Sequence, residues 1–312
     1  MRTINILISF AIVLTFYSAP SLLAEPRKQS AADVAIPDIP VDVYKHASGH
    51  GLQIYRFEPA GHEPLTEQRP AAVFFFGGGW NGGSVRQFEK HAKYLASRGM
   101  VIFLADYRVK KKHGTDPDAC VQDGKSAIRW VRANASQLGV DPNKIAAGGG
   151  SAGGHVAAAT GICNGFEDPT DSNIEISSKP NALLLFNPVY DNGPEGYGYS
   201  RVIEHFPAIS PAHNITSDDP PTLVFLGSKD KLVPVSTAQK FDTDLKRVGV
   251  HSALHVYSGQ PHGFFNESKS PRCFVDTILK MDHFLTSLGW LHGPPKRTVL
   301  CELLEEKPSR PN

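Results

Sequence analysis

The sequence has 312 residues, of which 41% are hydrophobic, and its 32 Lys and Arg residues nearly balance 31 Asp and Glu residues. Proteins that bind nucleic acid concentrate basic residues to neutralise phosphates, so this balance argues against a nucleic-acid partner. The hydrophobic share is well above that of chains too polar to bury a core, and four Cys in so long a chain exclude a small disulfide scaffold.

The N-terminus has the layout of a secretory signal peptide. Residues 1–5 include one Arg, residues 6–17 are almost entirely apolar, and the small residue Ala24 follows. A charged start, a short apolar run and a small residue at the cleavage site are typical of exported proteins. The apolar run is too short to span a bilayer, which needs about 20 residues. We therefore expect a signal peptide at residues 1–24, and a secreted or periplasmic mature chain without a membrane span.

Strand-like and helix-like segments alternate from residue 41 onward. The apolar runs at 71–76 and 100–105 suit strands that are buried on both faces of a parallel sheet. In all, about eight strands are expected, at 41–46, 52–57, 71–76, 100–105, 143–147, 182–186, 222–226 and 253–257. This pattern predicts an α/β fold in which helices cover both faces of a mostly parallel sheet.

Helices are expected between these strands. A stripe of apolar and small residues at spacings of three and four predicts one helix that packs on the sheet. The stripe consists of Val121, Gly124, Ile128, Val131, Ala135 and Leu138. Other helices are expected at 85–98, directly after Ser151, at 235–248 and near the C-terminus. A single domain at residues 41–291 accounts for all of these segments, with a short segment at 25–40 before it. The Pro-rich and charged tail at 292–312 is expected to be loosely ordered.

Residues 191–219 interrupt the alternation of strands and helices. This insertion is rich in Gly and aromatic residues, among them Tyr197 and Phe206. Long irregular segments in compact domains are usually functional, so we expect a cap that forms a wall of a substrate pocket. An inert surface loop is the alternative.

The strongest local motif is G-x-S-x-G, formed by Gly149, Ser151 and Gly153 between a predicted strand and a predicted helix. A Ser at a tight strand-to-helix turn needs small neighbours, and its hydroxyl then stands above the sheet where a substrate can reach it. Gly-rich structural turns produce similar strings, so this motif needs partners elsewhere in the chain.

Donors for an oxyanion would be the first of these partners. The strand at 71–76 leads directly into Gly77-Gly78-Gly79-Trp80, a loop whose backbone N–H groups are free of large neighbouring side chains. Together with the N–H group of Ala152, those of Gly78 and Gly79 are candidates for an oxyanion hole. Trp80 is a candidate pocket residue, and a sharp turn without a catalytic role is the alternative for the three glycines.

An acid and a base are expected after later strands. Asp230 directly follows the strand at 222–226, and His262 directly follows the strand at 253–257. The order Ser, Asp, His is the one expected for a catalytic triad in a sheet of this kind. Asp191 is the alternative acid, and the His residues of the insertion could line the pocket.

In combination, these motifs resemble the α/β-hydrolase superfamily, in particular the secreted bacterial carboxylesterases of the hormone-sensitive-lipase-like and feruloyl- or acetyl-esterase-like groups. The resemblance covers about residues 41–291. It implies that Ser151 is the nucleophile, Asp230 the acid and His262 the base. It also implies that the oxyanion donors are Gly78, Gly79 and Ala152. The loop in this family usually begins with His, whereas Phe76 stands there in this chain.

The resemblance implies a serine hydrolase that needs no cofactor or metal, and no H-E-x-x-H motif is present. We expect it to act on short acyl esters or on carbohydrate-linked acetyl or feruloyl esters. A prolyl-oligopeptidase-like peptidase or amidase is one alternative, and an inactive binding protein with a hydrolase fold is another. Of the four Cys, Cys273 and Cys301 could form a disulfide if the tail folds back along the last helix.

We predict that the exported protein begins near Glu25, because the predicted cleavage site follows Ala24. Mass spectrometry of the protein isolated from its native host should find this N-terminus. An intact Met1 on the exported protein would contradict the prediction.

Overall fold

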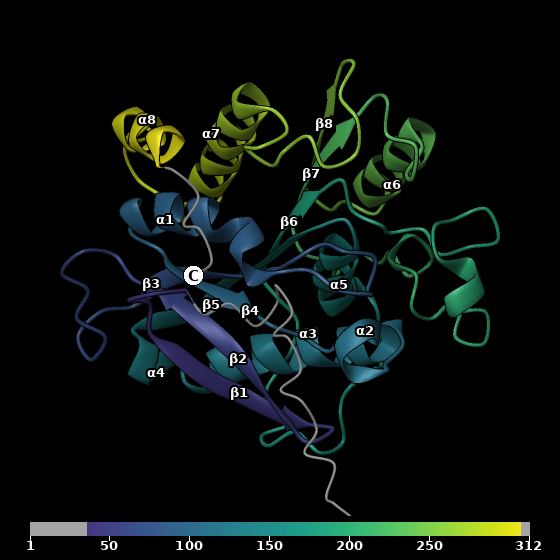
Figure 1. The fold of residues 1–312 in the computed structure, drawn as a ribbon, viewed down its shortest axis with the longest axis horizontal. Coiled ribbons are helices and arrows are strands. Elements are labelled where there is room, and N and C mark those ends of the chain that lie inside the picture. Colours follow the sequence, from purple (N-terminus) through teal and green to yellow (C-terminus); the bar gives the residue numbers. More distant parts are fainter. Residues whose placement is uncertain (1–35, 307–312) are drawn as a thin grey trace, which may run out of the picture.

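A computed structural model describes residues 36–306 of the chain. The predicted signal peptide at 1–24 and the first part of the segment at 25–40 lie outside the described residues. The fold is built on one eight-stranded sheet with the strand order β1-β2-β4-β3-β5-β6-β7-β8 (Figure 1). Strands β1 and β2 are antiparallel to each other, β2 is antiparallel to β4, and all other neighbours are parallel. The predicted α/β-hydrolase type of sheet is thereby confirmed.

The elements agree with the predicted alternation of strands and helices. The strands are β1 (Val41–Ala47), β2 (His50–Phe57), β3 (Arg69–Phe75), β4 (Val101–Ala105), β5 (Val140–Gly150), β6 (Ala182–Phe186), β7 (Thr222–Gly227) and β8 (Ser252–Tyr257). The α-helices are α1 (Glu89–Ser97), α2 (Lys110–His113), α3 (Pro117–Ala133), α4 (Ala135–Leu138), α5 (Ala152–Ile162), α6 (Val235–Arg247), α7 (Pro271–Ser287) and α8 (Arg297–Glu305). Short 3₁₀ helices are η2 (Val85–Phe88), η3 (Tyr199–Arg201) and η4 (Pro211–His213).

The core is formed by the central strands and the helices that pack on them. Every residue of β4, β6 and β7 is buried, as expected for parallel strands covered on both faces. All residues of α5 are buried as well, and its Ala and Gly residues allow it to lie close to the sheet. The G-x-S-x-G motif therefore joins the buried C-terminal half of β5 to the fully buried α5.

A buried carboxylate joins α1 to α7. Asp282 of α7 accepts hydrogen bonds from the Tyr94 hydroxyl at 2.7 Å and from Arg98 Nε at 2.6 Å. Its side chain has no exposed surface, so the Arg98 guanidinium compensates a charge that would otherwise be costly to bury. These helices and α8 lie together at one side of the sheet in Figure 1.

The prediction of a loosely ordered tail is wrong for residues 297–305, which form α8. Leu300 and Leu303 lie three positions apart and are both buried in the core. Lys93 of α1 forms an ion pair with Glu306 at 2.7 Å directly after the helix. The amphipathic spacing of the two Leu residues thus decides the structure of this segment, although Pro and charged residues surround it.

The Cys273–Cys301 disulfide, which the sequence leaves open, is absent from the structure, since both residues carry free thiols. Cys273 is buried at the start of α7, whereas Cys301 is exposed on α8. Helix α8 packs against α1 and does not fold back along α7 in the way that the pairing requires.

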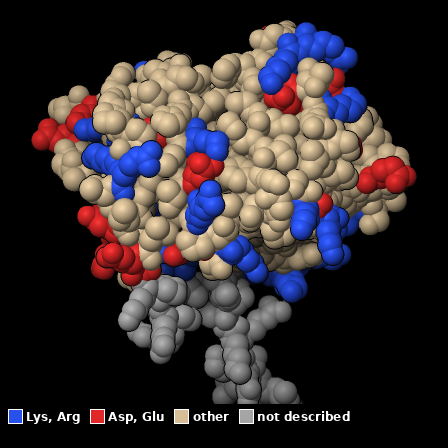
Figure 2. All heavy atoms as spheres, turned by 90° about the horizontal axis from the view of Figure 1, so that it is seen from above, with Lys and Arg blue, Asp and Glu red and all other residues tan. Residues whose placement is uncertain are grey.

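The surface carries both signs of charge. On the face shown in Figure 2, basic and acidic residues are interspersed, and a broad part of the surface carries neither. None of the helices within residues 36–306 has the length and apolar character needed to cross a bilayer.

His91 of α1 lies in an aromatic cluster of the core. Its ring contacts those of Phe88, Phe186, Phe265 and Phe274, with centroid distances of 5.0 to 6.2 Å. Within residues 36–306 neither ring nitrogen has a hydrogen-bond partner. Burial therefore lowers the pKa of His91 to about 3.

This imidazole should make the protein sensitive to acid. In the unfolded chain a His takes up a proton at about pH 6.5, whereas folded His91 stays neutral, so the free energy of unfolding falls as the pH drops below that value. Between about pH 7 and pH 5, His91 alone should lower it by about 2 kcal/mol. We predict that His91→Leu removes this part of the loss, as measured by urea unfolding at both pH values. An unchanged pH dependence in the variant would contradict the prediction.

Candidate active site

Ser151 lies at the turn between β5 and α5 in a backbone conformation that is rare for a residue with a side chain. Its φ is 55° and its ψ is −118°. The turn is so tight that a Cβ at Gly149 would lie 2.3 Å from the carbonyl oxygen of Gly153. A Cβ at Gly153 would lie 2.1 Å from the carbonyl oxygen of Phe75. Both outer positions of the G-x-S-x-G motif therefore require Gly.

The structure brings Ser151, His262 and Asp230 into one hydrogen-bonded row. Ser151 Oγ lies 2.9 Å from His262 Nε2, and His262 Nδ1 lies 2.7 Å from Asp230 Oδ2. A carboxylate can only accept, so Nδ1 carries the proton and donates to Asp230. The free Nε2 then accepts from the Ser151 hydroxyl, which is the arrangement that a general base needs.

Asp230 is held by its own loop. Its Oδ1 accepts hydrogen bonds from the N–H groups of Leu232 at 2.8 Å and Val233 at 3.0 Å. Burial raises the pKa of Asp230, but the hydrogen bonds from His262 and these N–H groups more than offset it, so its pKa lies below the ordinary value. The group is therefore ionised at neutral pH and can stabilise a charged imidazole.

Asn187 is a member of the site that the sequence reasoning missed. It follows β6 and is fully buried. Its Oδ1 accepts a hydrogen bond from the N–H group of Gly263 at 2.9 Å, and its Nδ2 lies 3.3 Å from His262 Nε2. A polar residue directly after a buried strand, at the same sheet edge as Ser151, was the available signal.

The Gly-rich loop lies against the turn that carries Ser151. A Cβ at Gly77 would lie 3.3 Å from the Cβ of Ser151, which shows how closely the loop approaches. Within residues 36–306, the N–H groups of Gly78 and Gly79 donate to no protein acceptor. Ala152 is the first residue of α5, so its N–H has no partner inside the helix. The three predicted donors are thus available to a bound group.

Phe76 takes a packing role at the position where the family resemblance implies His. Its ring stacks on that of Tyr107 at a centroid distance of 4.3 Å, and the Tyr107 hydroxyl donates to the Phe76 carbonyl. The loop itself is held by two other side chains. Gln87 accepts a hydrogen bond from the N–H group of Gly77 at 2.6 Å, and Arg201 of the insertion donates to the carbonyl of Gly79.

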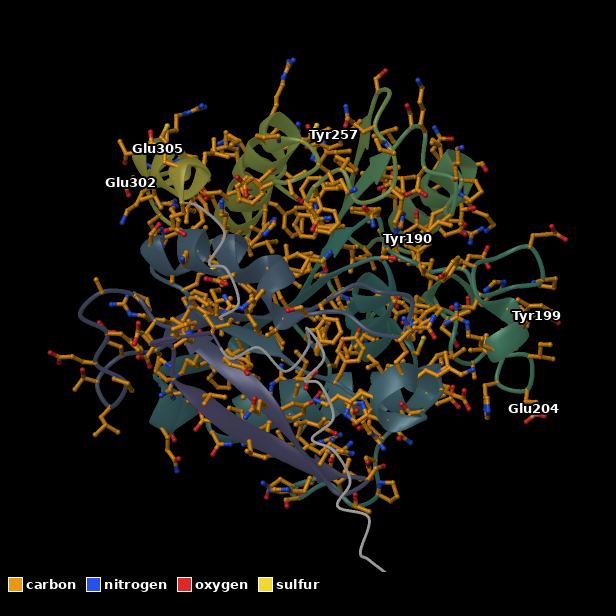
Figure 3. The ribbon with its side chains drawn as sticks, in the orientation of Figure 1. Tyr190, Tyr199, Glu204, Tyr257, Glu302 and Glu305 are labelled. Atoms are coloured by element: carbon orange, nitrogen blue, oxygen red, sulfur yellow. The ribbon has the colours of Figure 1, made fainter. Side chains whose placement is uncertain are left out.

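The predicted pocket residues occupy three different places. Trp80 is only 1% exposed and lies beneath the insertion, where its ring packs against those of Tyr197 and His155. It therefore supports the insertion and does not present a face to solvent. Phe206 lies farther out, edge-on to Tyr199, which is at the outer part of the insertion in Figure 3.

Tyr197 lines a cavity of about 240 Å³ beside the Asp230 loop. Tyr190 on the segment after β6, and Val233 and Thr237 after β7, form other parts of its wall. A Cβ on Gly79 would lie 3.0 Å from the Tyr197 hydroxyl, so this side chain lies between the cavity and the Gly-rich loop.

The alternative acid and the other His residues serve the insertion. Asp191 accepts a hydrogen bond from the N–H group of Gly193, at the start of the insertion. His155 binds the carbonyl of Ile209 at 3.0 Å, and burial lowers its pKa to about 4, so it is neutral. His205 lies 3.2 Å from Asp118.

Comparison with known families gives two matches along the chain. The model of the BD-FAE family matches residues 58–191, and that of the Dienelactone hydrolase family matches residues 194–290. The first segment contains the Gly-rich loop and Ser151, and the second contains Asp230 and His262.

Comparison with individual proteins points to esterases. The chain is 31% identical to esterase LipC and 29% identical to the probable carboxylic ester hydrolase LipM, both of Mycobacterium tuberculosis. These matches cover 64% and 72% of this chain, and it spans 54% and 56% of the length of the two relatives.

Two solved structures of esterase 2 of Thermogutta terrifontis resemble this chain, one phosphorylated by paraoxon and one with bound propionate. The sequence identity to this chain is 42% in each case. Each gives a TM-score of 0.78, and the matches cover 83% and 82% of this chain and 97% of either esterase chain.

Proposed function

The chain belongs to the α/β-hydrolase esterases, and we propose that it is a serine carboxylesterase that uses Ser151, His262 and Asp230 as its catalytic triad. The observation that carries this proposal is the row of hydrogen bonds of 2.9 and 2.7 Å from Ser151 through His262 to Asp230. A covalent modification by paraoxon is named for the Thermogutta terrifontis esterase and is consistent with a reactive Ser in this family.

Acylation begins when His262 Nε2 takes the proton of the Ser151 hydroxyl as Oγ attacks the ester carbonyl carbon. The carbonyl oxygen becomes negatively charged in the tetrahedral intermediate. We assign its stabilisation to the N–H groups of Gly78, Gly79 and Ala152, which have no competing acceptor within the described residues. Asp230 holds the tautomer of His262 and stabilises its positive charge.

Collapse of the intermediate releases the alcohol, which takes the proton from His262. The acyl group then remains on Ser151 as an ester. Water attacks this ester while His262 again removes a proton, and the second intermediate releases the carboxylic acid and restores the Ser151 hydroxyl. The same oxyanion donors serve both steps.

We propose short acyl esters as the substrates. We propose that the acyl group occupies the cavity lined by Tyr197 beside the Asp230 loop. Its volume of about 240 Å³ is below the usual range for drug-sized ligands, about 300 to 1,000 Å³, and so favours a short chain. Acetyl groups on carbohydrates meet this limit. Feruloyl esters have a larger acyl group, which would need space outside this cavity.

We predict that Ser151→Ala lowers the hydrolysis of p-nitrophenyl acetate by more than about 10³-fold, because the variant lacks the nucleophile. A stopped spectrophotometric assay of the folded variant against wild type measures this. Equal rates would contradict the proposal. Wild-type cleavage of peptide p-nitroanilides with no cleavage of esters would favour the peptidase alternative, and ligand binding without any hydrolysis would favour the binding protein.

We predict that Tyr197→Ala shifts the preference of the enzyme toward longer acyl chains, because it enlarges the cavity. The ratio of kcat/KM for p-nitrophenyl octanoate to that for the acetate should rise by about tenfold, as expected if about two more methylene groups are buried at about 0.8 kcal/mol each. A ratio is used so that any general loss of activity cancels.

Tyr199→Ala is the matched control, since Tyr199 belongs to the same insertion and packs on Phe206. It should leave the ratio unchanged. An equal shift in both variants, or in neither, would show that the cavity beside Tyr197 does not hold the acyl chain.

A further inference from the structure

Two amide side chains connect the Gly-rich loop to the loop that carries His262. Gln87 Oε1 accepts a hydrogen bond from the N–H group of Gly77 at 2.6 Å. Gln87 Nε2 then donates to Asn266 Oδ1 at 3.1 Å, and Asn266 Nδ2 donates to the carbonyl of Gly263 at 2.8 Å. The two residues are 179 positions apart in the sequence, so this is a tertiary contact and not a local turn.

The backbone groups at both ends determine how the amides are oriented. The Gly263 carbonyl can only accept, so it must face the NH₂ group of Asn266. The Asn266 oxygen then faces the NH₂ group of Gln87, and the Gln87 oxygen faces the N–H group of Gly77. Reversing either amide would place two donors or two acceptors against each other. The bridge therefore has one stable arrangement.

Asn187 continues this chain of hydrogen bonds to the base. Its Oδ1 accepts from the N–H group of Gly263, so both polar groups of the Gly263 backbone are bound by side chains. Its NH₂ group must then face His262 Nε2, which lies 3.3 Å away. Gly263, the residue next to His262, is thus held on one side by Asn187 and on the other by Asn266.

We propose that Gln87 and Asn266 are positioning residues that fix the distance between the oxyanion donors and His262. This inference depends on the proposed function, because it assigns a role within that site. The donors must match the position of the developing oxyanion while His262 must reach Ser151, and the two groups lie on separate loops. A displacement of about 1 Å between such groups can cost about 10²-fold in rate.

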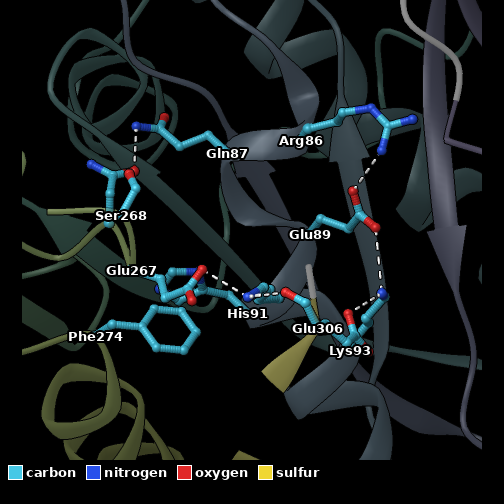
Figure 4. A pocket seen from close by; sticks show the side chains of 11 residues that line it. Arg86, Gln87, Glu89, His91, Lys93, Glu267, Ser268, Phe274 and Glu306 are labelled. Atoms are coloured by element: carbon cyan, nitrogen blue, oxygen red, sulfur yellow. Dashed lines mark hydrogen bonds and ion pairs between the residues drawn. The ribbon is translucent and has the colours of Figure 1, made fainter. Parts of the chain in front are cut away.

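The bridge lies at the edge of a surface pocket and not inside the core. Gln87 and Asn266 line a pocket of about 470 Å³ together with His91 and Phe274 (Figure 4). Its rim carries Lys90, which forms an ion pair with Glu267 at 2.7 Å. Because both amides are only partly buried, substitutions at these positions should be tolerated by the fold.

The test uses Gln87→Glu in the full chain. At neutral pH the new carboxylate can still accept from the N–H group of Gly77, but it cannot donate to Asn266 and repels its oxygen. We expect kcat for p-nitrophenyl acetate to fall by about tenfold or more while KM changes by less than about twofold, because the loss concerns the transition state. The affinity for an alkyl trifluoromethyl ketone, which forms a tetrahedral adduct with the nucleophile, should fall by a similar factor.

The pH profile separates positioning from a general loss of structure. A protonated Glu has both an acceptor and an O–H donor, so it can rebuild both contacts. The ratio of kcat for Gln87→Glu to kcat for wild type should therefore be higher at about pH 5 than at about pH 8. A variant that is merely less stable would show no recovery at the lower pH.

Two further variants complete the design. Gln239→Glu makes the same change at an exposed position of α6 and should behave as wild type. Asn266→Asp can still accept from Gln87 but cannot donate to Gly263, so its kcat should also fall. The inference would be overturned if the Gln87→Glu and Asn266→Asp variants fold and have the same kcat as Gln239→Glu at all pH values. Ester hydrolysis that survives Ser151→Ala would instead overturn the proposed function, which makes the two failures distinguishable.

Discussion

A Ser residue with a φ of 55° is the constraint on which the rest of the site depends. Such a conformation is unfavourable for any residue with a Cβ, and it persists only where the surroundings determine it. Here the surroundings are the close contacts of Gly149 and Gly153 with neighbouring backbone, together with the burial of β5 and α5. The hydroxyl of Ser151 therefore has a fixed position, and the other loops must lie close to it. The C-terminal ends of β3, β6, β7 and β8 lie at the same edge of the sheet as Ser151, so the loops that follow them can reach it.

The parts of the site that the sequence predicted are those whose chemistry leaves a local pattern. Ser151 has a motif around it, and Asp230 and His262 each follow a strand that the apolar runs predict. Asn187 leaves only a weak pattern, as a polar residue directly after a buried strand. The amides of Gln87 and Asn266 have none, because a single Asn or Gln is unremarkable unless its spatial neighbours are known. Their role follows from contacts between residues far apart in the chain, which periodicity and spacing do not reveal.

The wrong prediction at the C-terminal end has a similar origin. The composition of residues 292–312 is that of a loose tail, but Leu300 and Leu303 find an apolar surface on the core and form α8. Composition does not indicate which surface is available to a segment. The same fact excludes the Cys273–Cys301 disulfide that the sequence leaves open, because the path of the chain from α7 to α8 decides which residues Cys301 can approach. In α8 the packing of the segment thus overrides its local propensity.

The chain has Phe76 where the family resemblance implies His, and this difference bears on how the Gly-rich loop responds to pH. The groups that hold the Gly-rich loop are the Gln87 amide, the Tyr107 hydroxyl and the Arg201 guanidinium. None of them gains or loses a proton between weakly acidic and neutral conditions, whereas an imidazole in this place would. The shape of the loop is therefore independent of acidity across that range. A scaffold without an ionisable brace keeps the loop, and with it the N–H groups of Gly78 and Gly79, in one arrangement over this range of pH.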